Sequence, residues 1–366
     1  MSSFLTGFAA FTAGQAVMLA IGCGLLYLAV AREYEPMLLL PIGFGCILSN
    51  IPFSAAVGDH GPLTLLYNLG IVTELFPLLI FIAIGAMMDF GILLRNPRMF
   101  LFGGAAQFGI FFTVSVATLL GYDLKEAAAI GIIGAADGPT SIYVATRFAR
   151  HLLAPISVAA YTYMALVPII QPAVIRVLTT TAERRIRMPY REANLSRTVR
   201  IVFPVAVTVI AGLVAPISVA MVGFLMFGNL LRECGVTDRL AKASQNELAN
   251  LVTILLGITI GSTMQAGAFL TRSTLTIILL GLVAFSFDTA GGVLFAKLMN
   301  LFLKEKINPM VGASGISAFP MSARVIHQLA QKEDPANFLL NHSISANVAG
   351  QIGSIIAGGL ILALVK

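Results

Sequence analysis

The stretch GAADGPTSIYVATR (134–147) interrupts a largely apolar chain with an acid, two glycines, a proline and several hydroxyls. A second stretch, GASGISAFPMSAR (312–324), has a similar pattern. Glycine permits unusual backbone angles and proline suits the first turn of a new helix, so each stretch predicts a break between two helical segments. Irregular backbone at membrane depth is tolerated only where protein buries it or where it lines a wet cavity. The two breaks therefore indicate a functional site.

The composition predicts a polytopic helical membrane protein. The 366 residues are 58% hydrophobic and 11% charged, and the mean hydropathy is +0.91. Segments of about 20 apolar residues recur along the chain, as in helical membrane proteins. No removable signal peptide is evident, and the first apolar run reads as a first membrane helix. The predicted spans are 12–31, 36–50, 66–90, 99–121 and 153–178, then 201–215, 216–230, 246–270, 274–301 and 337–365, with broken segments at 125–149 and 308–325.

The two halves of the chain also match in letters. PMLLLPIGFGCILSN (36–50) corresponds to PISVAMVGFLMFGN (216–229), and IGAMMDFGILL (84–94) corresponds to IGSTMQAGAFL (260–270). The two broken stretches form a third pair in the same order. Secondary transporters are often built from such repeats. We therefore expect a first transmembrane repeat over 1–180, a charged cytoplasmic linker over 181–200, and a second repeat over 201–366.

The distribution of positive charge predicts the orientation of these repeats. If each broken segment is a hairpin that enters and leaves on one side, each half has about five spans and the halves are inverted. An external N-terminus then places most Lys and Arg on the cytoplasmic side, including the cluster from Arg184 to Arg200, as the positive-inside rule requires. The outer side keeps Lys125, Arg150, Arg272 and Lys366. The net charge of +6 lies in loops, so we interpret it as topology and do not expect nucleic-acid binding.

Oxygen-bearing side chains at the two breaks predict a site for a small cation. Asp137, Asn308 and Ser317 are hard oxygen ligands, and two half-helix breaks in corresponding places should meet near the midplane. Asp137 could instead only cap the helix that follows, yet an acid in the membrane costs at least ~2.5 kcal/mol where Ser or Asn would cap more cheaply. Asn308 and Ser317 could be polar contacts between helices. Arg324 could extend toward the membrane interface.

Further polar residues lie on the spans after each break. Tyr161 and Tyr163 follow the first break, while Asn347 and Gln351 follow the second. Tyr163 could be a core aromatic whose hydroxyl binds a carbonyl, and Asn347 could approach the second break. Asp89 is expected to have a structural role at a helix end, paired with Arg95 or Arg98. From the residues alone, a cation-coupled membrane transporter is predicted.

Long motifs of this sequence resemble one known family. They include EPMLLLPIGFGCILSNIP (35–52), PLLIFIAIGAMMDFGILL (77–94), AAIGIIGAADGPTSIYVATRFA (128–149), VAAYTYMALVPIIQP (158–172) and INPMVGASGISAFPMSARV (307–325). The family is the beta subunit of sodium-pumping, biotin-dependent decarboxylases of oxaloacetate, methylmalonyl-CoA or glutaconyl-CoA. The resemblance covers almost the whole chain. The short connection at 51–65, where some oxaloacetate members carry a long insertion, favours an acyl-CoA-type complex or a short oxaloacetate form.

The resemblance implies a mechanism with several partners. A carboxyltransferase subunit moves CO2 from the substrate acid to biotin on a carrier protein. The beta subunit then decarboxylates the carboxybiotin and exports sodium while a proton is consumed. A small single-span membrane subunit, a homo-oligomer within the complex and a prokaryotic inner membrane are also implied.

Site residues follow from the same resemblance. Asp137, Tyr163 and Arg324 are implied as catalytic residues, and Tyr163 and Arg324 as contacts to carboxybiotin. The implied sodium ligands are Asp137, Asn308, Gly312, Ser317 and Asn347.

An ordinary sodium/proton antiporter or sodium-coupled carboxylate transporter is the alternative function. It could share the repeat and the acid at a break, but it would need no biotin carrier. No phosphate-cradling G-x-x-x-x-G-K-[ST] motif is present, so energy must come from a gradient or from the bound chemistry.

Overall fold

Helices form the regular structure of residues 6–189 and 195–365, the part of the chain that this computed structural model describes. Six helical stretches in that part are long and apolar enough to cross a membrane, and a bent pair brings the number to seven. The six are Ala13–Ala31 (α2), Pro97–Leu119 (η2 Pro97–Met99, α7 Phe100–Ala105 and α8 Phe108–Leu119), Arg150–Leu178 (η4 Arg150–Leu152 and α11 Leu153–Leu178), Arg197–Val214 (α13), Arg272–Phe302 (α18) and Leu340–Leu364 (α21). The prediction of an all-α, multi-pass membrane protein is confirmed. Residues 190–194 of the predicted linker, and Lys366, lie outside the described residues.

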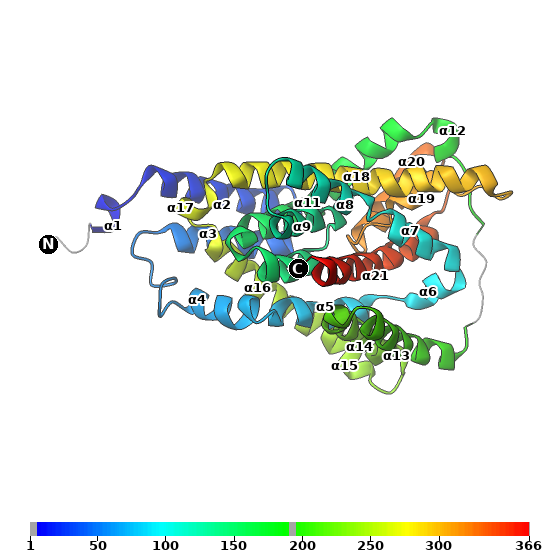
Figure 1. Ribbon diagram of the computed structural model, residues 1–366, viewed down its shortest axis with the longest axis horizontal. Coiled ribbons are helices and arrows are strands. Elements are labelled where there is room, and N and C mark those ends of the chain that lie inside the picture. The colour runs from blue at the N-terminus through cyan, green and yellow to red at the C-terminus, as the bar shows by residue number, and fades with distance from the viewer. Residues whose placement is uncertain (1–5, 190–194, 366) are drawn as a thin grey trace.

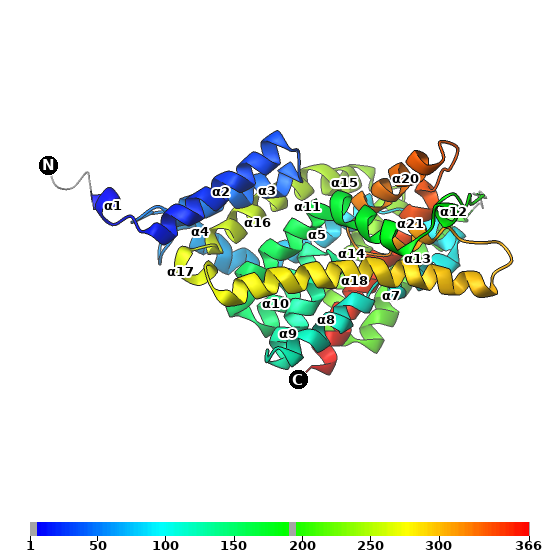
Figure 2. The same ribbon diagram turned by 90° about the horizontal axis from the view of Figure 1, so that it is seen from above.

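Shorter helices complete the chain (Figure 1). In the first half they are α1 (Thr6–Ala9), α3 (Pro36–Asn50), α4 (Pro62–Leu66), η1 (Tyr67–Val72), α5 (Leu75–Met87), α6 (Phe90–Arg95), α9 (Leu124–Gly131), η3 (Ile132–Ala135) and α10 (Gly138–Phe148). After α11 (Leu153–Leu178) they are α12 (Thr181–Arg184), η5 (Pro216–Ser218), α14 (Val219–Glu233), α15 (Asp238–Ala243), η6 (Ser244–Leu248), α16 (Ala249–Thr263), α17 (Ala266–Phe269), α19 (Pro309–Ala313) and α20 (Met321–Glu333). Figures 1 and 2 place α12 and α20 at one end of the molecule, here called the linker end, and α17 at the other.

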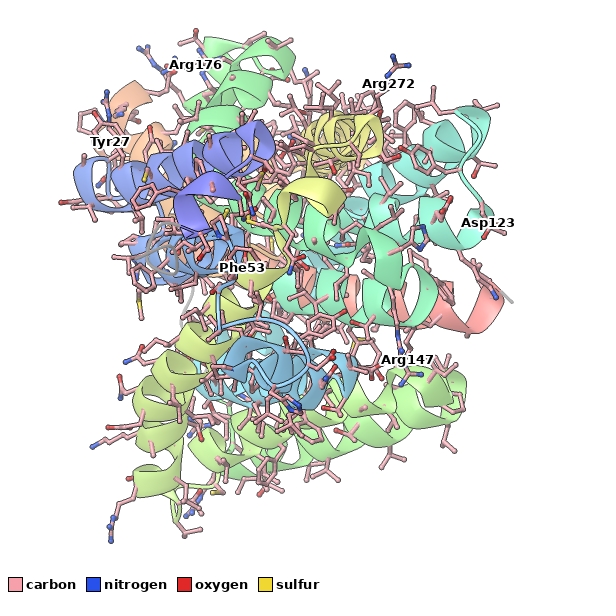
Figure 3. The ribbon with its side chains drawn as sticks, turned by 90° about the vertical axis from the view of Figure 1, so that its left-hand side faces the viewer. Tyr27, Phe53, Asp123, Arg147, Arg176 and Arg272 are labelled. Carbon is pink, nitrogen blue, oxygen red and sulfur yellow. The ribbon has the colours of Figure 1, made fainter. Side chains whose placement is uncertain are left out.

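The predicted span 66–90 is not one straight helix but two helical segments joined at a bend. Residues Pro62–Val72 and Leu75–Met87 meet at an angle of 63°. Glu74 adopts a left-handed conformation at the bend, with φ of 63°, and its carboxylate pairs with Arg147 at 2.8 Å. Arg147, near the end of α10, is labelled in Figure 3, which faces the end opposite the linker end. The ion pair therefore ties the bend to the first broken segment.

Paired glycines bring two sets of helices into close contact. Helix α3 packs on α16, and α14 packs on α5. A Cβ atom at Gly45 or Gly261 would overlap a backbone carbonyl oxygen of the facing helix, and so would one at Gly85 or Gly228. Membrane helices approach this closely only where small residues line the contact.

Two asparagines bind backbone groups freed where helices end. Asn50, at the end of α3, donates from Nδ2 to the carbonyl oxygen of Met264 at 2.7 Å and accepts from the Ala266 amide at 3.0 Å. Asn229, in α14, donates from Nδ2 to the carbonyl oxygen of Met88 at 2.9 Å. Each asparagine thus satisfies part of a helix break in the opposite half of the chain.

Asp89 has a local structural role. Its Oδ1 accepts from the Gly91 amide at 2.8 Å and so caps α6. Its other oxygen lies 3.7 Å from a guanidinium nitrogen of Arg232. The arginine that pairs with Asp89 is therefore Arg232 of α14, from the other half of the chain, where Arg95 or Arg98 was predicted.

Replacing Gly85 with Ala should destabilise the protein by about 1–3 kcal/mol, because the added methyl collides with the carbonyl oxygen of Leu225 in a packed contact. Thermal unfolding of the purified chain in detergent measures the effect. The matched control is Gly24→Ala in α2, where a Cβ atom meets nothing within 4 Å. Equal unfolding midpoints for the two variants would contradict the close packing of α5 on α14.

Candidate functional site

The two helix breaks meet through a backbone hydrogen bond. The amide of Ser317, in the second break, donates to the carbonyl oxygen of Ala135 in the first break at 2.9 Å. The Ser317 hydroxyl donates to the carbonyl oxygen of Gly350 in α21 at 3.0 Å. Ala136 has a left-handed backbone, with φ of 51°, and this turns the chain toward Asp137. Both breaks and α21 therefore share one junction.

Asp137 lies at this junction with 2% of its surface exposed. Its Oδ1 accepts from the Thr140 amide at 3.2 Å. Its Oδ2 accepts from the Thr140 hydroxyl at 2.7 Å, the Gln351 amide at 2.8 Å and the Ser354 hydroxyl at 2.7 Å. No Lys, Arg or His of the described residues pairs with it. Asp137 does cap α10, but three side-chain donors exceed what a cap needs.

These donors can also serve as cation ligands. A hydroxyl carries lone pairs besides its proton, and a half-turn of a glutamine amide presents its oxygen in place of its nitrogen. Thr140, Gln351 and Ser354 could therefore turn oxygens toward a cation that binds the Asp137 carboxylate. One carboxylate with several neutral oxygens is a donor set suited to a hard cation such as sodium.

Helix α21 carries a line of polar side chains from the linker end to Asp137. Ser343, Asn347, Gln351 and Ser354 are spaced by four, four and three residues, which places them on one face of the helix. All four are buried. Asn347 donates from Nδ2 to the carbonyl oxygen of Ile316 at 2.6 Å, while its Oδ1 has no hydrogen-bond partner among the described residues. Asn347 thus offers a free oxygen beside the second break.

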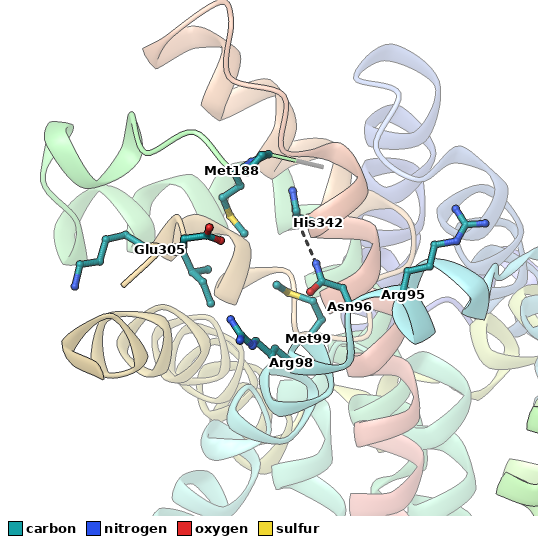
Figure 4. A pocket seen from close by; sticks show the side chains of 10 residues that line it. Arg95, Asn96, Arg98, Met99, Met188, Glu305 and His342 are labelled. Atoms are coloured by element: carbon teal, nitrogen blue, oxygen red, sulfur yellow. Dashed lines mark hydrogen bonds between the residues drawn. The ribbon is translucent and has the colours of Figure 1, made fainter. Parts of the chain in front are cut away.

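A basic pocket of about 240 Å³ opens where this polar face begins. Figure 4 shows Arg98 and Glu305 in the lining of this pocket, together with the Asn96–His342 contact of 3.4 Å, and the Arg95 side chain directed away from that contact. The charged and polar residues of the lining are Arg95, Asn96, Arg98, Glu305, Lys306 and His342. Because His342 lines the pocket and immediately precedes Ser343, the pocket adjoins the start of the polar face at the linker end.

Asn308 is not brought to the Asp137 cluster. Its Nδ2 donates to the carbonyl oxygens of Arg184 and Ile186, both at 2.8 Å, and its Oδ1 accepts from the Met310 amide at 3.0 Å. Asn308 therefore anchors the linker and caps α19. The predicted role of Asn308 as an oxygen ligand beside Asp137 does not fit these bonds.

Gly312 serves helix packing in this arrangement. It lies against Gly292 of α18, and a Cβ atom on either residue would overlap the carbonyl oxygen of the other.

The two tyrosines of α11 lie in different surroundings. The hydroxyl of Tyr163 donates to the carbonyl oxygen of Ile278 in α18, and its ring stacks on Phe285 at 6.4 Å between centroids. Tyr161 lies beside the first break, where a Cβ atom on Gly138 would be 2.8 Å from the tyrosine hydroxyl. Tyr163 therefore fits its structural alternative, and Tyr161 is the tyrosine that lies next to Asp137.

Arg324 lies on the exposed side of α20, away from the buried junction. Its charged neighbour is Glu35, before α3: burial raises the pKa of the Glu35 carboxyl, and the Arg324 guanidinium opposes that rise. The position leaves Arg324 accessible to a partner at the protein surface.

Comparison with known proteins shows the family to which the chain belongs. The family model of the Na+-transporting oxaloacetate decarboxylase beta subunit matches residues 14–365. The chain belongs to this family. It is 52% identical to the methylmalonyl-CoA decarboxylase subunit beta of Veillonella parvula, over 99% of this chain and 96% of the relative. It is 51% identical to the glutaconyl-CoA decarboxylase subunit beta of Acidaminococcus fermentans, over 98% of this chain and 96% of the relative. The oxaloacetate decarboxylase beta chain of Klebsiella pneumoniae is 44% identical, with 96% and 95% covered.

In this beta-subunit chain, some polar residues of the junction were not predicted from the sequence. Thr140 and Ser354 bind Asp137 directly, but isolated hydroxyls in small-residue helices give no distinctive pattern. Asp288 is a second fully buried acid. Its signal was available, because it is a lone carboxylate inside the apolar run of α18.

Replacing Asp137 with Asn should leave the beta subunit folded but lower sodium-dependent decarboxylation by about 100-fold or more, because an amide carries no charge and, whichever way it turns, directs its NH2 group at one or more of the donors that Asp137 accepts from. Carboxybiotin turnover by the complex in vesicles measures this. The matched control is Asp123→Asn, since Asp123 caps α9 at the exposed end of the same broken segment. Wild-type turnover in Asp137→Asn would contradict the assignment.

Proposed function

We propose that this chain is the membrane subunit that decarboxylates carboxybiotin on a partner carrier protein and exports sodium while a proton is consumed. The observation that carries the proposal is the junction of two helix breaks around Asp137, a buried carboxylate satisfied by neutral donors alone. Sodium is the transported substrate at this carboxylate. Its ligands would come from Asp137, Thr140, Gln351 and Ser354, with Asn347 and Ser317 beside them.

The chain is proposed to consist of two inverted repeats, 1–180 and 201–366, each with one broken helical hairpin. The equivalent contacts of Asn50 with Met264 and of Asn229 with Met88 support this, because the sequence pairs Met88 with Met264. The contacts of α3 with α16 and of α14 with α5 are equivalent in the same way. The first candidate membrane helices of the two halves, α2 and α13, are also alike: only 17% and 6% of the residues in their apolar windows are buried.

Decarboxylation breaks the bond between the biotin ureido nitrogen and the carboxylate carbon. Carbon dioxide leaves, and the nitrogen takes one proton. Export of one charge against about 100 mV costs about 2.3 kcal/mol, so release of CO2 must be coupled to a change in the affinity of the site for sodium. Tyr163 is proposed to supply the proton, which requires its hydroxyl first to leave the carbonyl oxygen of Ile278.

The linker end is proposed to be the cytoplasmic side of a prokaryotic inner membrane. Sodium would enter from this end along the polar face of α21, whose buried side chains lead to Asp137. Exposed Arg324 would hold the carboxylate of carboxybiotin through a paired contact, for which a guanidinium is suited.

The partners are proposed to be a carboxyltransferase, a biotin carrier protein and a small single-span membrane subunit, within a complex that holds more than one copy of this chain.

An acyl-CoA is proposed as the parent substrate. The chain is 52% and 51% identical to the beta subunits of the two acyl-CoA decarboxylases, and 44% identical to that of the oxaloacetate decarboxylase. The alignment with the oxaloacetate decarboxylase beta chain runs over 411 residues, more than the 366 of this chain, so that relative has additional residues.

The alternative of an antiporter or carboxylate symporter is not favoured, because these relatives are decarboxylase subunits.

Replacing Ser354 or Gln351 with Ala should raise the sodium concentration for half-maximal decarboxylation by roughly tenfold each, the equivalent of about 1.4 kcal/mol, because each change removes one neutral ligand. Saturating sodium should restore most of the rate, since the carboxylate remains. Sodium titration of the reconstituted complex gives both values.

The control for this titration is Ser345→Ala. Ser345 is equally buried on α21, but its hydroxyl faces the carbonyl oxygen of Ile92 at 3.4 Å. Its sodium dependence should match the wild type. Unchanged sodium dependence in both Ser354→Ala and Gln351→Ala would refute sodium binding at the Asp137 cluster.

A further inference from the structure

Asp288 is a second carboxylate in the middle of the membrane region. It lies near the midpoint of α18 and is 0% exposed. None of the ion pairs among the described residues includes it. The proposed pump mechanism makes no use of it.

One oxygen of Asp288 caps a neighbouring helix. Its Oδ1 accepts from the Ile110 amide at 3.1 Å, in the first turn of α8 (Phe108–Leu119). A Cβ atom on Gly109 would lie 2.7 Å from this oxygen, so the backbone of α8 comes very close. The cap accounts for one carboxylate oxygen only.

The other oxygen faces the first broken segment. Asp288 Oδ2 is buried and has no hydrogen-bond partner among the described residues. A Cβ atom on Gly134 would lie 2.6 Å from it. Gly134 precedes Ala135, whose carbonyl oxygen holds the second break, and Asp137 follows three residues later. Asp288 therefore touches the segment that positions the Asp137 site.

Capping does not require a charge at this position. Asn or Ser caps a helix as well as Asp does, and an acid inside a membrane costs free energy that those residues avoid. Buried neutral hydroxyls also lie on the two helices that meet here. The buried hydroxyls of Thr113, on the same face of α8 as Gly109, and of Thr289 have no partner among the described residues.

The described elements packed on α18 offer Asp288 no paired cation. Helices α7, α8 and α19 and the turn η3 carry no titratable side chain. The titratable or charged side chains on α9, α11 and α18 itself are Lys125, Glu126, Tyr161, Tyr163, Arg176, Arg272 and Lys297. Of these, Glu126 pairs with His151 and Lys297 with Glu183.

We propose that Asp288 is a second binding site for a small monovalent cation, Na+ or H+, in addition to the Asp137 cluster. The cation binds Oδ2 while Oδ1 keeps its bond to α8. Binding neutralises the carboxylate beside Gly134 and thereby holds the first break against α18. The proposal rests on the pump function, because it concerns an ion that is bound during turnover.

Asp288→Asn is the decisive variant, because an amide oxygen can still accept from Ile110 whereas the charge is lost. The complex is reconstituted in vesicles, and decarboxylation is titrated with sodium at fixed pH and then with pH at saturating sodium. A sodium ligand predicts a roughly tenfold or greater rise in half-saturating sodium. A proton site predicts unchanged sodium dependence and the loss of one limb of the pH profile. Either result supports the proposal.

Asp89→Asn is the matched control, since Asp89 also caps a helix through one oxygen but has a side chain 36% exposed. If Asp288→Asn does not fold, Asp288→Ser retains a capping oxygen without charge and is measured in its place. Wild-type sodium and pH dependence in a folded, uncharged variant would show Asp288 to be a cap alone and overturn the inference. A wild-type complex without sodium activation would overturn the pump function itself.

Discussion

A carboxylate buried away from every cation must be satisfied by neutral donors, and most of the site depends on how Asp137 meets that requirement. Its partners come from two elements: Thr140 belongs to the helix that Asp137 caps, whereas Gln351 and Ser354 belong to α21. Breaking those bonds without replacement leaves a buried charge, which is costly. Sodium is one replacement, because it supplies positive charge while the same side chains turn their oxygens inward. The proposed sodium binding would therefore be coupled to helix docking at one residue.

The two breaks have equivalent places in the sequence but unequal chemistry. The first break contributes the acid, while the second contributes the Ser317 amide that binds the Ala135 carbonyl oxygen. Symmetry is closer at the asparagines Asn50 and Asn229, which bind helix ends across the halves. On the proposed two-repeat organisation, these paired contacts form a symmetrical frame around an asymmetrical centre. That division suits a pump, since the frame can be shared by both halves while charge is concentrated at one point.

The sequence predicted the helical class, the two breaks and Asp137, because glycine, proline and an acid inside apolar runs are strong local signals. It could not predict the partners of Asp137, since Thr140 and Ser354 become informative only when α10 and α21 are brought together. The contacts of Asn308 could not be predicted for the same reason: its residue type suits an ion ligand, and only the fold shows that its amide donates to the carbonyl oxygens of Arg184 and Ile186. The bend at Glu74 was missed because the apolar run continues through it. Asp288 was detectable and was overlooked, since no glycine–proline pattern accompanies it.

The central claim is that the Asp137 junction binds sodium, and ion-specific stabilisation of the purified chain tests it most directly. Thermal unfolding is measured in NaCl and in KCl at equal ionic strength, for the wild type and for Asp137→Asn. A ligand that binds only the folded state stabilises it by about 2.7 kcal/mol at 100 times its dissociation constant. The account predicts a higher midpoint in sodium than in potassium for the wild type, and no difference for the variant. Equal midpoints in the two salts for the wild type, or a sodium effect that survives in Asp137→Asn, would contradict it.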